Sequence, residues 1–266
     1  MPNNPAQDSI QHQMLAKERH REILGRVADL GGVRVATLAH ELNVTPETIR
    51  RDLEKLGSEG KLIRIHGGAM PIGNDRRELP LDVRGTVNLN QKRAIARHAA
   101  RFVSHGDVIA LDASSTAREM ARALPNIPLT VVTNAVAVAT ALVDRPEIRV
   151  VSTGGLLDGP SLSFVGPIAE ETLARFHIKK AFISCQGVDL ERGLSVTADE
   201  HAGIKRRMLD LAESVYLLAD ATKFGRKAVE FFAQLAEIDL VVTDSSAPAE
   251  TLREFRAAGH AVESAA

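Results

Sequence analysis

The sequence predicts an α/β protein in two parts: a small N-terminal helical domain with a β-hairpin, and a larger Rossmann-like domain with a mostly parallel sheet. Residues 15–70 contain short helical patterns set closely together. From residue 91 onward, helical patterns alternate with short apolar runs, as expected for a sheet flanked by helices. Between these regions, residues 71–90 are polar and interrupted by proline and glycine, which is typical of a linker. Residues 1–14 show little periodicity and predict a mobile tail.

Composition narrows the class of protein. The chain has 266 residues, of which 44% are hydrophobic and 25% charged, as in ordinary globular proteins. The 33 basic and 34 acidic residues leave a net charge of −1, so no overall basic field attracts nucleic acid. The sequence has no apolar run near the ~20 residues of a membrane span, and its first residues are polar. We therefore expect a cytoplasmic protein without membrane contact.

Metal and disulfide chemistry have little support in the sequence. The single cysteine, Cys185, cannot form a disulfide within the chain and follows an apolar run, which favours a buried side chain. None of the nine histidines belongs to a set with metal-ligand spacing. We therefore expect no metal and no resident cofactor.

The small domain contains two helical patterns in close succession. Val35, Leu38 and Leu42 mark one apolar face of a short helix, and Asn43-Val44 makes a tight connection. Thr45 is a good N-cap for the next helix, with Pro46 in its first turn. The second helix exposes a face with Thr48, Arg51 and Lys55, and with Arg50 beside it. This is the order of a helix-turn-helix, whose second helix enters the DNA major groove.

A β-hairpin follows the second helix. Residues 61–65 predict a strand, His66-Gly67-Gly68 a turn, and Ala69-Met70 the return strand. A hairpin in this position is a wing, from which Arg64 and His66 reach the DNA backbone or minor groove. The alternative is an ordinary helical pair whose arginines form solvated pairs such as Glu47–Arg51 and Arg50–Glu54.

The residues of this module resemble a known signature. The DNA-binding motif of the DeoR family of bacterial transcriptional regulators closely resembles two segments of this chain, Thr45 to Leu53 and Leu62 to Ala69. The resemblance implies double-stranded operator DNA as a partner, with Thr48, Arg50 and Arg51 on bases and phosphates and Arg64 and His66 in the wing. We add Thr45 and Lys55 to this DNA-binding set.

The larger domain, residues 91–266, alternates predicted strands with predicted helices. The strands are expected at 108–111, 129–132, 148–151, 181–184, 215–218 and 239–242, and the helices near 91–104, 115–124, 134–144, 165–176, 200–213 and 248–258. Ligands of open α/β sheets bind at the carboxyl ends of the strands. The polar residues after each strand are therefore the candidates for ligand binding.

Hydroxyl-rich and glycine-rich segments stand at these strand ends. Asp112 and Ser114-Ser115-Thr116 enter a helix, an arrangement suited to a phosphate or sugar hydroxyls, although helix capping explains the serines equally well. Asn134 and Gly154-Gly155 follow the next two strands. The segment from Gln186 to Ser195 is compatible with a plain turn. His201 and Lys205 share a helix face, either as an acid–base pair or as a polar rim.

In their order along the chain, these segments resemble the effector domain of the same DeoR family, which is similar to the sugar-phosphate isomerase and CoA-transferase fold. The resemblance implies an effector-binding and oligomerisation domain that takes a phosphorylated sugar or related metabolite. The effector-binding residues it implies are Asp112, Ser114, Ser115, Thr116, Asn134, Gly154, Gly155, Lys205 and Lys223. Two positions depart from the family pattern: Ser114 stands where a glycine is usual, and His201 stands where an acidic residue is usual.

The expected function is a ligand-responsive regulator, as a rule a repressor of a carbohydrate catabolic operon, acting as a homodimer or homotetramer on repeated operator half-sites. One alternative is a sugar-phosphate isomerase or transferase fused to a DNA module, with Asp112, His201, Lys205 and Lys223 as acids and bases. Another is an architectural DNA-binding protein with a vestigial ligand site.

Overall fold

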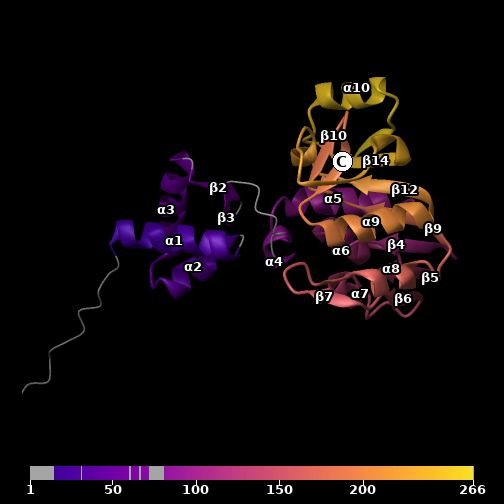
Figure 1. Ribbon diagram of the computed structural model, residues 1–266, viewed down its shortest axis with the longest axis horizontal. Helices are drawn as coiled ribbons and strands as arrows, with labels where there is room; N and C mark the ends of the chain where they lie inside the picture. The colour runs from indigo at the N-terminus through magenta and orange to yellow at the C-terminus, as the bar shows by residue number, and fades with distance from the viewer. Residues whose placement is uncertain (1–14, 31, 60, 66, 72–80, 266) are drawn as a thin grey trace, which may run out of the picture. The chain divides into compact units, whose positions relative to one another are not determined.

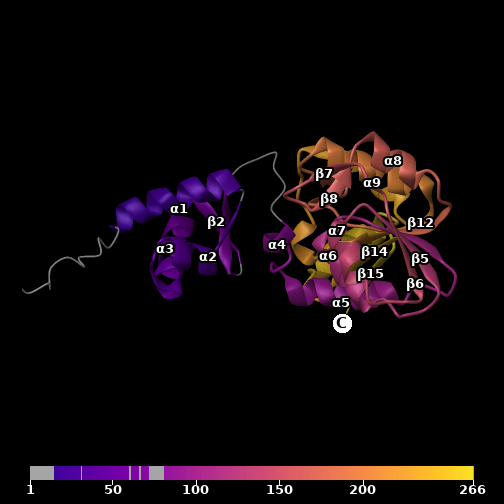
Figure 2. The ribbon, with the colours of Figure 1, turned by 90° about the horizontal axis from the view of Figure 1, so that it is seen from below.

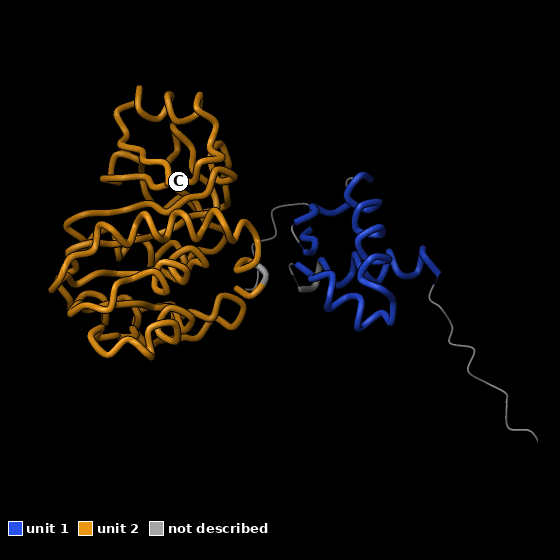
Figure 3. The backbone as a smooth tube through the Cα atoms, turned by 180° about the vertical axis from the view of Figure 1, so that it is seen from behind, with its two compact units in different colours: residues 1–72 blue, residues 73–266 orange. Residues whose placement is uncertain are grey.

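The computed structural model describes residues 15–30, 32–59, 61–65, 67–71 and 81–265. The chain divides into two compact units, residues 1–72 and 73–266 (Figure 3). The expected tail and residues 72–80 of the expected linker lie outside the described residues. Each unit has its own buried apolar cluster, so each is described by itself.

Within its described residues, the first unit contains three helices and a small antiparallel sheet. Its elements are α1 (Ala16–Leu30), β1 (Val33–Arg34), α2 (Val35–Glu41), α3 (Pro46–Ser58), β2 (Leu62–Ile65) and β3 (Gly68–Pro71). The winged helix-turn-helix is therefore confirmed. The tight turn between α2 and α3 needs a left-handed residue, and Asn43 supplies it with a φ of 50°.

The two-residue strand β1 was not predicted. It pairs with β3 and extends the wing to three strands in the order β1-β3-β2. A side chain at Gly68 would place its Cβ 2.0 Å from the Val33 carbonyl oxygen, so only glycine permits this pairing.

A buried ionic cluster joins α1 to α3. The carboxylate of Asp52 accepts hydrogen bonds from the Arg19 guanidinium, with one N–O distance of 3.1 Å, and contacts His20 Nε2 at 2.9 Å. Burial alone would raise the pKa of Asp52, but the hydrogen bonds from Arg19 and His20 outweigh burial and lower that pKa. Asp52 thus fixes α3 against α1 while the opposite face of α3 stays exposed.

The second unit is built around a parallel sheet of seven strands. In chain order its elements are α4 (Leu81–Arg84), α5 (Leu89–Ala100), β4 (Val108–Leu111), α6 (Ser115–Ala123), β5 (Leu129–Thr133), α7 (Val136–Ala141), β6 (Ile148–Ser152), β7 (Leu156–Asp158), β8 (Ser163–Val165), α8 (Pro167–Leu173), β9 (Ile178–Ile183), β10 (Gly187–Asp189), β11 (Gly193–Val196), α9 (Asp199–Leu211), β12 (Ala212–Leu218), η1 (Ala221–Lys223), β13 (Glu230–Ala233), η2 (Leu235–Glu237), β14 (Leu240–Asp244), α10 (Ala249–Ala257) and β15 (Val262–Ala265). Helices and strands alternate along most of this unit (Figure 1).

The strand order is β15-β14-β12-β9-β4-β5-β6, and every pairing between these strands is parallel. Six of the seven strands match the predicted strands. The edge strand β15 was missed because Val-Glu-Ser-Ala is short and only half apolar.

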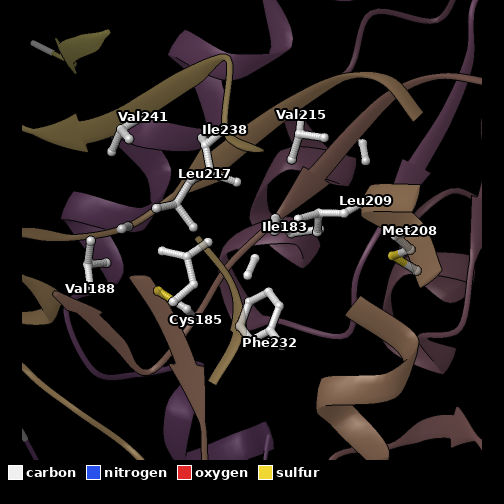
Figure 4. Close-up of a cluster of buried hydrophobic side chains, with 14 of the residues drawn as sticks. Ile183, Cys185, Val188, Met208, Leu209, Val215, Leu217, Phe232, Ile238 and Val241 are labelled. Carbon is white, nitrogen blue, oxygen red and sulfur yellow. The ribbon is translucent and has the colours of Figure 1, made fainter. Parts of the chain in front are cut away.

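Helices cover both faces of the sheet. Residues of α5 and α6 form one apolar cluster with Ile109 and Val131, and Figure 2 shows α5 on the face opposite to α8 and α9. On the other face, Met208 of α9 lies in one apolar cluster with Ile183 and Leu217 of the sheet (Figure 4). Ile204 of α9 belongs to the same cluster. These two buried faces explain why the strands are continuous apolar runs.

Short hairpins account for the places where the expectations were wrong. The segment from Gln186 to Ser195 is not a plain turn, because β10 and β11 form an antiparallel hairpin that β13 extends. The helix expected from residue 165 begins at Pro167, since β8 pairs with β7. Within the expected linker, α4 folds as part of the second unit, with the Leu81 side chain buried.

Candidate nucleic-acid interface and ligand site

The outer face of α3 carries the predicted DNA-binding residues. Ile49, Leu53 and Leu56 point into the core, which leaves Arg50 and Arg51 with 58% and 78% of their side chains exposed. Lys55 is also exposed, and Thr48 is partly exposed. Four of the predicted residues therefore lie on the accessible side of α3, the second helix of the motif: Thr48, Arg50, Arg51 and Lys55.

Thr45, just before α3, and Glu47, in its first turn, make polar contacts on this surface. Thr45 caps α3, because its hydroxyl accepts a hydrogen bond from the Thr48 backbone N–H at 3.2 Å. Glu47 lies 3.1 Å from Arg50 and 3.8 Å from Arg51, as exposed ion pairs. Such exposed pairs contribute little to stability, so both guanidinium groups stay accessible to other anions. Of the two pairs in the alternative interpretation, Glu47–Arg51 is present, whereas Arg50 pairs with Glu47 and not with Glu54.

The wing contributes Arg64, whose guanidinium lies 3.4 Å from Glu54 of α3. Its aliphatic carbons pass over Gly57, where an added Cβ would lie 3.2 Å from Arg64 Cγ. Arg64 is therefore held against the recognition helix. His66 lies outside the described residues.

In the second unit, the strand order reverses between β4 and β9, and Asp112 lies at the carboxyl end of β4. Its carboxylate accepts hydrogen bonds from the backbone N–H of Ser114 at 3.0 Å and of Ser184, just after β9, at 2.8 Å. The same carboxylate is paired with the Lys205 ammonium from α9. Asp112 is 1% exposed and Lys205 is 9% exposed. The predicted residues Asp112 and Lys205 thus meet at the switch point of the sheet, where ligands of this architecture bind.

The loop after Asp112 serves the start of α6. Ser114 is the N-cap, since its hydroxyl accepts a hydrogen bond from the Ala117 backbone N–H at 3.0 Å. Ser115 and Thr116 lie in the first turn with their side chains buried. In a helix the N–H groups of the first turn have no partner within the helix, so this end of α6 favours a negative charge.

Asn134 follows the end of β5, and Gly154-Gly155 follow the end of β6. Asn134 is buried and donates from its side-chain amide to the Phe164 carbonyl at 2.9 Å, so it fixes β8 against the end of β5. Its Oδ1 and the hydroxyl of Thr153 are buried without a hydrogen-bond partner among the described residues. Gly154 and Gly155 have φ values of 64° and 117°, which explains the glycine pair by backbone conformation.

His201, which stands where the family usually has an acidic residue, receives an acidic partner from another element. Its Nε2 lies 3.4 Å from the carboxylate of Asp158, at the end of β7. Burial raises the pKa of Asp158, but hydrogen bonds from Ser161 and the charge of His201 lower it overall. The carboxylate that is missing at position 201 is thus supplied from the β7–β8 hairpin.

A group of cations near the carboxyl end of β12 was only partly predicted. Lys92 of α5 is 6% exposed and donates to the Arg84 carbonyl at 2.6 Å. Burial, followed by the charge of Lys223, lowers the pKa of Lys92 to about 7, and Arg84 and Arg118 act in the same direction. The neighbouring carboxylate, Asp220, acts against them. We name Arg84, Lys92, Arg118 and Lys223 the cation cluster.

The cation cluster and the Asp112–Lys205 pair belong to one neighbourhood. Lys223 of the cation cluster and both members of the Asp112–Lys205 pair act electrostatically on Cys185, the buried thiol just after β9. Burial raises the pKa of this thiol to about 12. A separate surface hollow between α8 and α9, lined by Glu170 and Arg206 among others, contains none of the predicted effector-binding residues. The carboxyl edge of the sheet is therefore the better candidate for a ligand site.

Two further findings concern the described part of the chain. It contains no cluster of three or more histidine, cysteine or acidic side chains arranged to hold a metal ion. Nor does any helix among these residues have the length and apolar character needed to span a membrane.

The chain joins a winged helix-turn-helix to an α/β domain whose strands end among polar and basic side chains. This combination defines a DNA-binding protein with a sensor domain. Residues 19–73 match the family described as "DeoR-like helix-turn-helix domain" and residues 87–245 match "DeoR C terminal sensor domain". The chain belongs to the DeoR family of transcriptional regulators.

Curated relatives agree over nearly the whole length. The chain is 43% identical to the uncharacterized HTH-type transcriptional regulator YulB of Bacillus subtilis, over 87% of this chain and 90% of the relative. It is 37% identical to the L-fucose operon activator of Haemophilus influenzae, over 86% and 92%. It is 31% identical to a putative aga operon transcriptional repressor of Escherichia coli, over 91% of each chain.

Proposed function

We propose that this regulator is a repressor of a carbohydrate catabolic operon, and that a phosphorylated sugar at the carboxyl edge of the second unit controls its binding to operator DNA. Relatives named for the fucose and aga operons support the carbohydrate assignment. One of them is named an activator and the other a repressor, so the sign of regulation must be tested by measuring transcription with and without the regulator.

DNA binding rests on the exposed face of α3 and on the wing. Arg50, Arg51 and Lys55 contact phosphates and base edges in the major groove, with Thr48 between them, while Arg64 contacts the backbone. Thr45 contributes by holding the first turn of α3. Two copies of the chain bind two half-sites, in a dimer or tetramer assembled through the second unit.

The observation that carries the effector assignment is the cation cluster. The charges of Lys223, Arg84 and Arg118 each lower the pKa of the buried Lys92, and the Asp220 carboxylate acts against them. Arg118 also forms an ion pair with Glu119 at 3.4 Å. Placing a buried lysine among other cations is costly unless an anion compensates them. A phosphate dianion supplies that compensation, and Asp112, Lys205 and the start of α6 offer hydrogen bonds to sugar hydroxyls nearby.

The ligand is bound without being turned over in this proposal. Asp112 already accepts two backbone hydrogen bonds and an ion pair, and His201 is engaged with Asp158. An acid or base catalyst needs to exchange its proton with substrate, which these interactions oppose. A steady-state assay with pentose and hexose phosphates tests this: measurable isomerisation favours the enzyme alternative.

The direct test is a thermal-unfolding screen of the full chain with sugar phosphates and the matching unphosphorylated sugars. A ligand of the native state raises the unfolding temperature by mass action. We expect stabilisation by a phosphorylated sugar and not by its parent sugar. Lys92→Met should abolish that stabilisation, whereas Arg97→Met, on the exposed side of α5, should retain it. If no phosphorylated sugar stabilises the wild-type chain, the effector assignment is wrong.

A further inference from the structure

The carboxyl ends of three neighbouring strands carry a row of polar residues. Leu111 of β4, Thr133 of β5 and Ser152 of β6 are register partners. The backbone N–H of the residue after Ser152 donates to the Thr133 carbonyl at 3.0 Å, so the parallel pairing continues one step further. The residues that follow the three partners stand side by side, and we name them the polar row: Asp112, Asn134 and Thr153.

The polar row points to the side of the sheet that α9 covers. Side chains two positions earlier in each strand belong to, or pack against, the apolar cluster that contains Met208 of α9. Side chains two positions apart on a strand point to the same face of the sheet. The ion pair between Asp112 and Lys205 of α9 agrees with this direction. The side chains that define it are Ala110, Val132 and Val151.

Asn134 is fixed in orientation by Phe164 of β8. The side-chain Nδ2 of Asn134 donates to the Phe164 carbonyl at 2.9 Å, and the Phe164 backbone N–H donates to the Asn134 carbonyl at 2.7 Å. A carbonyl can only accept, so the atom of the Asn134 amide that contacts it is the nitrogen. Oδ1 is therefore the remaining acceptor, and it is buried without a hydrogen-bond partner among the described residues.

Thr153 supplies the second buried group without a partner. Its side chain is buried, and its Oγ1 makes no hydrogen bond within the described part of the chain. The contrast is Thr133 on the neighbouring strand, whose hydroxyl donates to the Leu111 carbonyl at 2.7 Å and accepts from the Ala135 N–H at 3.0 Å. A buried polar group without a partner costs free energy. Two of them on neighbouring strand ends therefore indicate a place where a polar ligand binds.

We propose that Asn134 and Thr153 form a hydroxyl-binding subsite, which contacts hydroxyl groups of the sugar and not its phosphate. This inference rests on the proposed function, because it assigns one part of the phosphorylated sugar to one part of the second unit. Asn134 Oδ1 accepts, whereas Thr153 Oγ1 both donates and accepts, so hydroxyl groups satisfy both. A phosphate dianion has only acceptors, and it is repelled by the amide oxygen and by the carboxylate of Asp112 in the same row.

The subsite makes Thr153 a specificity-determining residue. A ligand that lacks the matching hydroxyl leaves a buried polar group unpaired, so the site discriminates against deoxy sugars. The cation cluster, in contrast, recognises the phosphate whatever sugar carries it. The choice among sugar phosphates therefore depends on the ends of β5 and β6.

Titration calorimetry of the full chain tests the subsite with hexose 6-phosphates and pentose 5-phosphates, each beside its single-deoxy analogues, and with inorganic phosphate. We expect Thr153→Val to weaken the best-bound sugar phosphate about tenfold, as for one lost hydrogen bond, and to change the affinity for inorganic phosphate by less than about twofold. The deoxy analogue that lacks the hydroxyl bound by Thr153 should bind wild type and Thr153→Val equally, because both deletions remove the same hydrogen bond.

Thermal unfolding of the free chain supplies a readout that a structural role of Thr153 would reverse. Thr153→Val should raise the unfolding temperature by about 2–4 °C, because valine keeps the shape and removes an unpartnered hydroxyl. The matched control Thr133→Val should lower it, since that hydroxyl makes two hydrogen bonds. A similar decrease in Thr153→Val would show that its hydroxyl is already bonded in the free chain, as to buried water, and overturns the subsite.

The remaining outcomes separate the subsite from the proposed function. Unchanged affinity of Thr153→Val for every sugar phosphate, or an equal loss of affinity for inorganic phosphate, overturns the subsite and leaves the proposed function standing. If no sugar phosphate binds the wild-type chain, the proposed function fails, and the unphosphorylated parent sugars then decide the subsite. It stands if a parent sugar binds wild type more tightly than Thr153→Val, and it fails if none does.

Discussion

The carboxylate of Asp112 and the ammonium of Lys205, 93 residues apart in the chain, form a buried ion pair at the point where the sheet reverses its strand order. The pair joins the end of β4 to α9, and it lies close enough to Cys185 to influence the thiol. A contact between such distant residues marks the proposed ligand site more sharply than any single motif does.

Removing one member of this pair should destabilise the second unit. In Asp112→Asn the buried Lys205 ammonium loses its charged partner, and we expect a loss of about 3–5 kcal/mol in the free energy of unfolding. The double variant Asp112→Asn with Lys205→Met should recover much of the loss. Urea unfolding followed by circular dichroism measures both, and strictly additive effects would show that the two groups are not coupled.

Stability should depend on pH through Lys92. Its pKa is about 7 in the folded chain, against about 10.4 for an unperturbed lysine. Between these values the unfolded chain binds a proton that the folded chain lacks, so the free energy of unfolding rises as pH rises through this window. Lys92→Met should flatten that rise and increase stability near pH 7. An unchanged slope in the variant would place the titration elsewhere.

Ligand binding should take up a proton. At pH 8 Lys92 is largely neutral, whereas a bound phosphate dianion favours its ammonium form. Titration calorimetry in two buffers of different ionisation enthalpy should show uptake of up to about one proton per site. The same titration with Lys223→Met should show weaker affinity and a smaller uptake, because loss of the Lys223 charge raises the pKa of Lys92 in the free protein. Proton release on binding would contradict this assignment.

Arg51→Ala should weaken DNA binding without affecting the fold. The Arg51 side chain is 78% exposed and its ion pair with Glu47 is long, so we expect a stability change within about 0.5 kcal/mol. Binding to a duplex selected by the wild-type chain should weaken, and the salt dependence should fall by about one unit if Arg51 contacts a phosphate. Arg97→Ala serves as the charge-matched control. Wild-type affinity in Arg51→Ala would remove this residue from the interface.

Cys185 should be inert in the native protein. Its side chain is buried and its pKa is raised to about 12, so almost no thiolate exists at pH 8. We expect negligible labelling by a thiol reagent until the chain unfolds, and complete labelling in denaturant. Rapid native labelling, measured by mass spectrometry, would show that the sheet edge opens to solvent.

Local signals predicted the helices and the hairpin of the DNA-binding unit, although not the short strand β1. The cap at Thr45, the apolar spacing of Ile49 and Leu53, and the glycines of the wing act over short separations, so the sequence alone predicted the helix-turn-helix and its exposed face. The main strands of the parallel sheet were predicted for a related reason, since burial on both faces produces continuous apolar runs. The small strands β7, β8, β10, β11 and β13 carry no such run.

The proposed ligand site depends on contacts between distant residues, which local sequence patterns do not predict. Lys92 was not predicted, although the sequence contains a signal for it. It shares the apolar face of α5 with Ile95, Ala96 and Ala99. A lysine on a buried face indicates a buried hydrogen-bond partner. Asp158 was missed because its relation to His201 depends on a hairpin that periodicity does not reveal. Ser114, in contrast, fits its capping alternative.

By itself, the sequence determined the two-part organisation of the protein, the class of each part and the exposed face of α3, because helix caps and apolar periodicity act over a few residues. Only the tertiary structure decided which charges meet at the sheet edge. Lys92, Asp112, Lys205 and Lys223 come from separate elements, and their pKa values and pairings depend on burial and distance that no local pattern encodes.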